Sequence, residues 1–168
     1  MLSKEFRPPA QKEMDAIYMM GYDAWAEGQT EALYLERCRT SQKYKAGNWL
    51  VLCINGIPIS SLLIHNFGQW VAFQIRGIGS LATQPAYRGL GYAHEIIKYT
   101  IGNLSEIEKA NVIFLYSDIN PAFYQSVGFM SLPQQFQKEK DSVLMAYMLP
   151  IFDEAVLNNN RDKIPRYF

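Results

Sequence analysis

The stretch that decides the fold of this chain is Leu81-Ala82-Thr83-Gln84-Pro85-Ala86-Tyr87-Arg88-Gly89-Leu90-Gly91-Tyr92-Ala93. It joins a long apolar strand pattern, residues 71–83, to a helical pattern that runs from Gly89 to Gly102. The first amides of a helix have no intrahelical acceptor, and the helix dipole adds partial positive charge there. Because glycine lets the backbone approach a ligand closely, the stretch predicts a cradle for phosphate oxygens. The Arg88 side chain can add a charged contact.

A glycine-rich turn of this kind also fits a tight strand-to-helix connection that binds nothing. The stretch is not a Walker loop, because no Gly-Lys-Ser/Thr sequence follows the glycines. It is also a poor dinucleotide fingerprint, because the third glycine is missing and the preceding strand lies in mid-chain behind a hairpin. The context of the stretch must therefore decide between a ligand site and a plain turn.

Upstream of this stretch, the pattern predicts one strand, two helices and a hairpin. Residues 2–7 read as a strand, apolar residues at helical spacing run from Gln11 to Trp25, and Thr30 caps a second helix. Asn55-Gly56 is a strong hairpin signal between strands at 48–54 and 57–65. Gly68 is predicted to mark a further turn before the strand at 71–83.

Downstream, the pattern continues the sheet and closes a βαβ crossover. A buried strand at 112–116, a short helix at 121–127, and strands from Phe129 onward and over 142–149 are predicted. The whole order, β-α-α-β-β-β-α-β-α-β-β, predicts a single α/β or α+β domain with a mixed sheet over residues 1–150. Residues 151–168 are predicted to form a partly ordered C-terminal tail.

Composition excludes several classes of protein. Lys+Arg and Asp+Glu balance at 16 each, so the basic excess of a nucleic-acid binder is absent. No stretch approaches the roughly 20 apolar residues of a membrane span. Cys38 and Cys53, with His65 and His94, lack metal-site spacing, so we expect two buried, reduced thiols and no metal. A cytoplasmic protein is the expectation.

Two motifs resemble those of the GNAT superfamily of N-acetyltransferases. The central motif of that family, Gln/Arg-x-x-Gly-x-Gly/Ala, is met by Arg88, Gly91 and Ala93, although Thr83 replaces the usual valine of the preceding strand. The family's second motif, a short helix that carries a tyrosine and ends in Gly-Phe, resembles residues 120–129, with Tyr124 before Gly128-Phe129. The strand order over residues 2–149 is also similar. The resemblance implies a mostly antiparallel sheet with a central βαβ crossover.

The resemblance also implies a donor and a reaction. The donor would be acetyl-CoA, with no metal, and the amine of a small molecule or peptide would attack the thioester directly. Tyr124 would be the general acid for the leaving thiolate, and the side chain of Asn120 would touch the cofactor arm. The arm would pair with the backbone of Leu81, Ala82 and Thr83. The pyrophosphate would rest on the backbone amides of Arg88, Gly89, Leu90, Gly91, Tyr92 and Ala93.

The general base and the acceptor are less well marked. Residues 73–80 contain no carboxylate, so a water chain, Glu27, Asp118 or a tail group is left as the base. Trp25 and Glu27 would suit a cationic amine, whereas Gln74 and Arg76 would suit an anionic or peptide-like acceptor. The sequence does not choose between these interpretations, and the aromatic residues also fit a core and the acids a solvated surface.

Two other functions are compatible with the same sequence. The missing strand carboxylate fits a sensor or regulatory module that binds acyl-CoA without transferring the acyl group. An interaction domain without any cofactor is the third hypothesis. A homodimer is among the expected assemblies.

Overall fold

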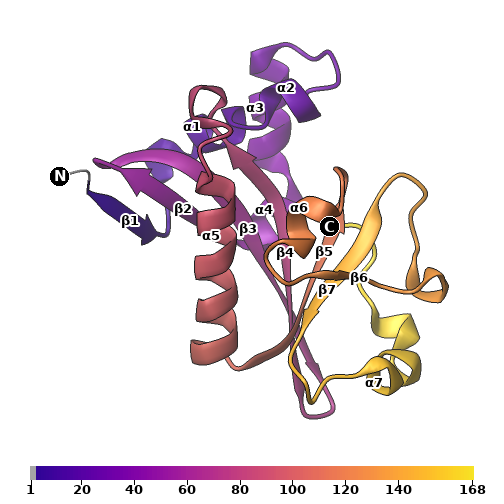
Figure 1. Cartoon of the computed structure of the whole chain (residues 1–168). Coiled ribbons are helices and arrows are strands. Elements are labelled where there is room, and N and C mark those ends of the chain that lie inside the picture. Colours follow the sequence, from indigo (N-terminus) through magenta and orange to yellow (C-terminus); the bar gives the residue numbers. More distant parts are fainter. Residues whose placement is uncertain (1–2) are drawn as a thin grey trace. The chain divides into compact units, whose positions relative to one another are not determined.

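A computed structural model describes residues 3–168 and contains one seven-stranded sheet (Figure 1). The strand order is β1-β2-β3-β4-β5-β7-β6. Strands β4 and β5 are parallel, whereas β1–β2, β2–β3, β5–β7 and β6–β7 are antiparallel pairs. Because α5 connects the parallel strands β4 and β5, the chain contains the predicted βαβ crossover, and the predicted fold class is confirmed.

The strands are β1 (Lys4–Arg7), β2 (Asn48–Ile54), β3 (Ile57–Trp70), β4 (Phe73–Thr83), β5 (Ala110–Ser117), β6 (Met130–Ser131) and β7 (Val143–Met148). The α-helices are α1 (Met14–Met19), α2 (Tyr22–Trp25), α3 (Glu31–Thr40), α4 (Gln42–Ala46), α5 (Tyr92–Gly102), α6 (Ala122–Gln125) and α7 (Glu154–Asn159). Short 3₁₀ helices are η1 (Gln11–Glu13), η2 (Pro85–Tyr87), η4 (Gln134–Phe136) and η5 (Arg161–Lys163), and η3 (Asn103–Ile107) is a π-helix.

Several predicted elements are confirmed in place. Strand β2 has the predicted bounds, and Asn55 and Gly56 form the hairpin turn with φ angles of 48° and 79°. Thr30 caps α3, because its Oγ1 accepts a hydrogen bond from the amide of Leu33 at 3.4 Å. The predicted first strand began at residue 2, which lies outside the described residues, and β1 covers Lys4–Arg7.

The predicted turn at Gly68 is wrong. Gly68 lies inside β3, which continues to Trp70, and the chain turns after it, where Val71 has a φ of 55°. Gly68 itself has a φ of 74°, and its amide donates to Oδ1 of Asn66 at 2.9 Å. A glycine signals a left-handed backbone, but a strand can absorb that residue as a local irregularity without ending.

The predicted helix over Gln11–Trp25 is broken into η1, α1 and α2. The break falls at Gly21, where an added Cβ would lie 2.0 Å from the ring of Trp25. The tryptophan ring therefore lies directly on the glycine backbone, and periodicity alone could not reveal this close approach. Likewise α5 begins at Tyr92 and not at Gly89, because Gly89 and Gly91 adopt left-handed φ angles that a helix cannot contain.

Two compact units make up the chain. Unit one comprises Met1–His65 and Ser80–Ile97, described from Ser3 onward, and unit two comprises Asn66–Gly79 and Lys98–Phe168. The core of unit one contains two apolar clusters, one of which includes buried Cys53 and the other buried Cys38; both thiols are unbridged, as predicted. Burial raises the pKa of each thiol.

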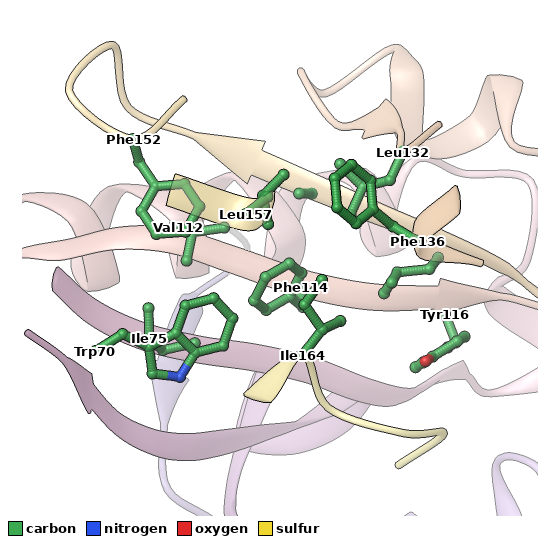
Figure 2. Packing of buried hydrophobic residues seen from close by; sticks show 12 residues of the cluster. Trp70, Ile75, Val112, Phe114, Tyr116, Leu132, Phe136, Phe152, Leu157 and Ile164 are labelled. Atoms are coloured by element: carbon green, nitrogen blue, oxygen red, sulfur yellow. The ribbon is translucent and has the colours of Figure 1, made fainter. Parts of the chain in front are cut away.

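The core of unit two draws on the C-terminal segment (Figure 2). Phe114 of β5 is fully buried there, in a cluster that includes Phe136. Residues 151–168 contribute Phe152, Leu157 and Ile164 to the same cluster, each at most 2% exposed. The C-terminal segment therefore belongs to the hydrophobic core of this unit.

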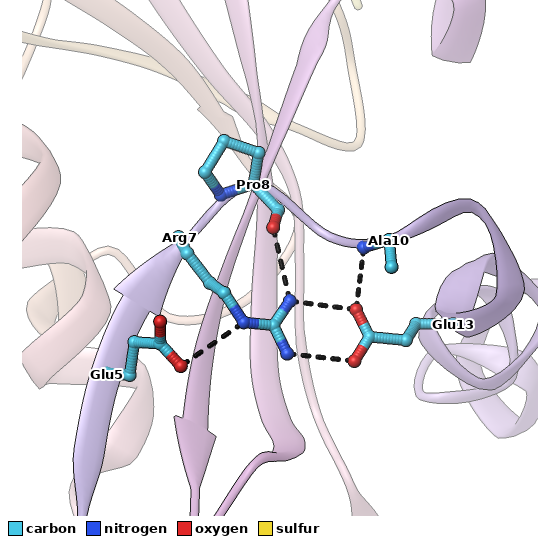
Figure 3. Close-up of polar contacts among 5 residues, drawn as sticks. All are labelled: Glu5, Arg7, Pro8, Ala10 and Glu13. Carbon is cyan, nitrogen blue, oxygen red and sulfur yellow. Dashed lines mark hydrogen bonds and ion pairs between the residues drawn. The ribbon is translucent and has the colours of Figure 1, made fainter.

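An ion pair fixes the connection from β1 to the first helices in unit one (Figure 3). The guanidinium of Arg7 donates to both carboxylate oxygens of Glu13 at 2.8 Å, and the amide of Ala10 donates to Oε2 of Glu13 at 2.7 Å. These donors lower the pKa of Glu13 to about 2, with the Arg7 hydrogen bonds as the main cause. The carboxylate of Glu13 is therefore stabilised in its charged form.

Replacing Glu13 with glutamine is expected to lower the free energy of unfolding by about 1–2 kcal/mol near neutral pH, because a bidentate, charge-assisted pair is lost. The folded pKa of about 2 lies below the ordinary value of 4.5, so the stabilisation is present above 4.5 and is lost as pH falls toward 2. Urea titrations of both proteins across this range would measure the difference. Glu5→Gln is the control, because Glu5 makes one contact to Arg7 at 3.3 Å and is mostly exposed. A difference that does not depend on pH would contradict this account.

Candidate functional site

The predicted phosphate cradle is a loop in unit one between η2 and α5. Gly89 and Gly91 have φ angles of 76° and 85°, and an added Cβ at either position would meet no atom within 4 Å. Glycine is therefore needed at both positions for the backbone conformation, and open space lies above it. Residues 88–91 are all exposed. The loop is therefore accessible from solvent.

Helix α5 begins at the end of this loop. The amide of Glu95 donates to the carbonyl of Gly91 at 3.1 Å, so the first helical hydrogen bond returns to the second glycine. The amides of Tyr92 and Ala93 therefore precede that bond and lie at the positive end of the helix dipole. Ile96, Ile97 and Ile101 of α5 are buried.

Lys4 also reaches this helix start, which the sequence did not predict. Its Nζ pairs with Glu95 at 2.7 Å and lies 5.8 Å from the ring centroid of Tyr92. These two pairings raise the pKa of Lys4, with the Glu95 hydrogen bond as the main cause. No local pattern could indicate the contact, because Lys4 comes from β1 and Glu95 from α5, 91 residues apart in the chain.

The side chain of Arg88 is turned toward the protein. Its Nη1 and Nη2 donate to the two carboxylate oxygens of Asp23 at 2.5 and 2.9 Å. Its Nη2 also donates to the carbonyl of Met20 at 3.0 Å, and its Nε to the carbonyl of Thr83 at 3.1 Å. We call this arrangement the Asp23–Arg88 clasp. The sequence analysis offered the Arg88 side chain as a phosphate contact, but in the structure the guanidinium pairs with the carboxylate of Asp23. The hydrogen bonds from Arg88 lower the pKa of Asp23.

Hydrogen bonds to β3 hold the end of strand β4. Oγ of Ser60 donates to the carbonyl of Ala82 at 3.0 Å and lies 2.9 Å from Oγ1 of Thr83. The amide of Gln84 donates to the carbonyl of Ile59 at 2.9 Å. Ser80, just before this end, has a left-handed φ of 49°, which for a residue with a Cβ marks local strain.

The second motif forms a turn in unit two that buries Tyr124, Val127 and Phe129. Tyr124 lies in α6, and its carbonyl accepts the amides of Val127 and Phe129 at 3.1 and 3.2 Å. Gly128 has a φ of 99°, and an added Cβ would lie 2.9 Å from the ring of Tyr147. Both the backbone conformation and the lack of space therefore favour glycine at this position. Burial, and then the charge of Asp118, raise the pKa of Tyr124 to about 12. The phenol therefore stays protonated at physiological pH.

Asn120 opens the same turn. Its Oδ1 accepts the amide of Ala122 at 3.0 Å, so the side chain carbonyl is used to start α6. The residue is exposed. The side chain amide group of Asn120 is the part that a ligand could meet.

The two carboxylates named as candidate bases have different surroundings. In unit two, both oxygens of Asp118 accept hydrogen bonds, one from the hydroxyl of Ser142 and one from that of Tyr167 at 2.6 Å. In unit one, the side chain of Glu27 is 77% exposed and pairs with Arg37 at 3.1 Å. The carboxylate of Asp118 is thus held by two hydrogen bonds, whereas the carboxylate of Glu27 belongs to a solvent-exposed ion pair.

The residues predicted to contact the acceptor also differ in burial and in hydrogen-bond partners. Arg76 is buried in unit two, where it donates to Glu108 at 2.8 Å, to Oδ1 of Asn66 and to the carbonyl of Ile75. The backbone amide of Gln74 donates to Oδ1 of Asn111 at 2.7 Å. Trp25 is partly exposed in unit one, with its ring on Gly21. The contacts of Arg76 are those of a structural ion pair, which sequence reasoning could not distinguish from a ligand contact.

A surface cavity of about 550 Å³ opens in unit two. It is lined by Lys138, Glu139, Lys140, Asp141, Ser142 and Tyr167. The sequence did not single out these residues, because the cavity depends on the C-terminal segment folding back to the loop before β7. The helices formed by residues 3–168 include none that is long and apolar enough to cross a membrane.

Comparisons with known proteins place this geometry in context. The sequence profile of the acetyltransferase (GNAT) domain matches residues 5–131. Among curated protein sequences, none matches the chain. Similar solved structures include a probable N-acyltransferase from Enterococcus faecalis V583, with 22% identity and a TM-score of 0.62 over 78% of this chain and 33% of that one. The chain thus spans about a third of the length of that protein.

Two further solved structures are similar over nearly their whole length. The ribosomal-protein-S18-alanine N-acetyltransferase of Escherichia coli is 15% identical, with a TM-score of 0.63 over 90% of this chain and 97% of that one. A chain of the NatC complex bound to Gag peptide and CoA is 16% identical, with a TM-score of 0.63 over 88% of this chain and 99% of that one. At these identities the likeness shows a shared fold.

Proposed function

Because the chain belongs to the GNAT family of acetyltransferase domains, we propose that it transfers an acetyl group from acetyl-CoA to a primary amine of a small molecule or peptide. The observation that carries the proposal is the exposed loop at the start of α5, with two left-handed glycines and open space above them. This loop matches the family's central motif residue by residue at Arg88, Gly91 and Ala93.

The donor is proposed to bind along the loop and the end of β4. The pyrophosphate oxygens accept hydrogen bonds from the backbone amides of residues 88–93, where the helix dipole favours negative charge. The amide groups of the cofactor arm pair with the backbone at Leu81, Ala82 and Thr83. The side chain amide of Asn120 is a further proposed contact to the arm. No metal is needed in this scheme.

The proposed chemistry is direct transfer. The neutral amine forms a C–N bond to the thioester carbonyl carbon, the C–S bond breaks, and Tyr124 donates its phenolic proton to the departing sulfur. The amine loses one proton, which passes to Asp118, to Glu27 or through water to solvent. A backbone N–H at the end of β4 is proposed to stabilise the oxyanion. The raised pKa of Tyr124 supports its role as an acid, because it stays protonated.

For the acceptor we favour a cationic amine over an anionic one. Arg76, the cation proposed for an anionic acceptor, is buried and already paired with Glu108. Trp25 is partly exposed and the side chain of Glu27, although paired with Arg37, is 77% exposed. An aromatic residue and a carboxylate suit an ammonium group before it loses its proton. The similar structures named for an alanine of a ribosomal protein and bound to a peptide support a peptide amine as one candidate.

Two measurements test the proposed function. Calorimetry with acetyl-CoA is expected to give saturable binding; no heat at millimolar donor would overturn both the transferase and the acyl-CoA sensor. Release of free CoA thiol with a panel of polyamines, peptides and amino acids then separates these two. Binding without thiol release for any amine would favour the sensor. A cytoplasmic location and a homodimer remain predictions.

A further inference from the structure

The Asp23–Arg88 clasp joins three segments of unit one. Arg88 is the first residue of the cradle, Thr83 ends β4, and Met20 and Asp23 belong to the α1–α2 segment. All three nitrogens of the guanidinium donate to these partners. One side chain therefore connects the loop proposed for the pyrophosphate to the segment that carries the candidate acceptor residue Trp25.

From this geometry we propose that Asp23 is a positioning residue for acetyl-CoA. By holding the guanidinium of Arg88, it keeps the cradle in the conformation that receives the phosphates. The inference rests on the proposed function, because it assigns a role within the same donor site. It also implies that donor binding and the order of the α1–α2 segment are linked, since binding energies between two coupled sites are reciprocal.

The clasp is better suited to positioning than to stability. The side chains of Arg88 and Asp23 are 44% and 54% exposed, and ion pairs at that exposure contribute little to the free energy of unfolding. The loop that it holds contains two glycines, which without the clasp can adopt many backbone conformations. If only about one loop in ten then has the binding conformation, the apparent dissociation constant rises about tenfold.

Unit one offers a matched control in the pair of Asp15 and Arg39. Arg39 donates to both carboxylate oxygens of Asp15, at 2.9 and 2.5 Å, and the two side chains are 51% and 53% exposed. This pair joins α1 to α3 and makes no contact with the cradle. Asp15→Asn therefore removes the same chemistry at the same exposure without touching the loop.

The test compares CoA binding by calorimetry in the wild-type chain and in Asp23→Asn, Asp23→Glu and Asp15→Asn. We expect Asp23→Asn to weaken CoA binding about tenfold, Asp23→Glu to recover most of the affinity, and Asp15→Asn to change it less than about twofold. Hydrogen exchange supplies a second readout. CoA is expected to protect the amides of residues 14–26 in the wild type and in Asp15→Asn, but much less in Asp23→Asn.

Each other outcome counts against the inference. Wild-type affinity in Asp23→Asn would show that the clasp does not position the cradle. An equal loss in Asp15→Asn would show a general effect of surface charge. If Asp23→Asn does not fold, unchanged affinity in a folded Arg88→Lys variant, which cannot form the bidentate pair, would overturn the inference. Absence of CoA binding in the wild type would instead overturn the proposed function itself.

Discussion

Replacing Gly91 with glutamate is expected to weaken acetyl-CoA binding by at least about 100-fold, because like charges brought together cost several kcal/mol. Gly91 has a φ of 85°, and the space where its Cβ would lie is open. A glutamate there would therefore project a carboxylate toward the position proposed for the pyrophosphate. It would also impose a left-handed backbone on a residue with a Cβ, at a cost of about 1–2 kcal/mol. Calorimetry with acetyl-CoA measures the loss.

Gly56→Glu separates these two effects. Gly56 has a φ of 79°, its Cβ position is also open, and it belongs to the same unit in the turn between β2 and β3. The variant carries the same strain and the same added charge away from the cradle, so it is expected to lose stability but to bind the donor normally. If Gly91→Glu bound acetyl-CoA as tightly as Gly56→Glu, the phosphate site would have to lie elsewhere.

Replacing Tyr124 with phenylalanine is expected to lower kcat by about 100- to 1,000-fold, within the range by which positioned general acids accelerate reactions. The change removes only the hydroxyl, because the ring still packs against Phe123 and Phe129 at centroid distances of 4.9 and 6.2 Å. Binding of acetyl-CoA should therefore change little. Because the pKa of Tyr124 is about 12, the phenol keeps its proton below that pH. The wild-type rate should therefore not fall through deprotonation of Tyr124 until the pH approaches that value. Thiol release with the best acceptor found measures kcat and its pH dependence.

Tyr147→Phe is the matched control for the phenol. Tyr147 lies on β7 and contacts the same aromatic group, with its ring 5.9 Å from that of Phe129. Removal of its hydroxyl is expected to leave kcat within a factor of about two, as for most substitutions away from the reacting groups. A full rate in Tyr124→Phe, or an equal loss in both variants, would remove Tyr124 from the proposed mechanism.

Local backbone chemistry explains which parts of the fold could be predicted. Asn55-Gly56 and Thr30 act through their own turn and cap, so a few residues contain the whole signal. The cradle glycines belong to this group as well, because left-handed φ angles are a property of single residues. Gly68 shows the limit of such a signal: its φ is left-handed, but the residue lies inside β3, which continues to Trp70.

Contacts between distant residues explain what could not be predicted. The Arg88 side chain is hydrogen bonded to Asp23, 65 residues away in the chain. The same reason hides the structural role of Arg76, which pairs with Glu108. In both cases the partner residue lies far away in the sequence and leaves no local pattern.

A crystal structure of the chain with bound CoA tests the central claim most directly, because it locates the donor relative to named backbone atoms. We predict that the pyrophosphate oxygens lie within hydrogen-bonding distance of the amides of residues 88–93, with the arm along residues 81–83. We further predict that the Asp23–Arg88 clasp stays closed in this complex. CoA bound with its pyrophosphate away from this loop would contradict the account.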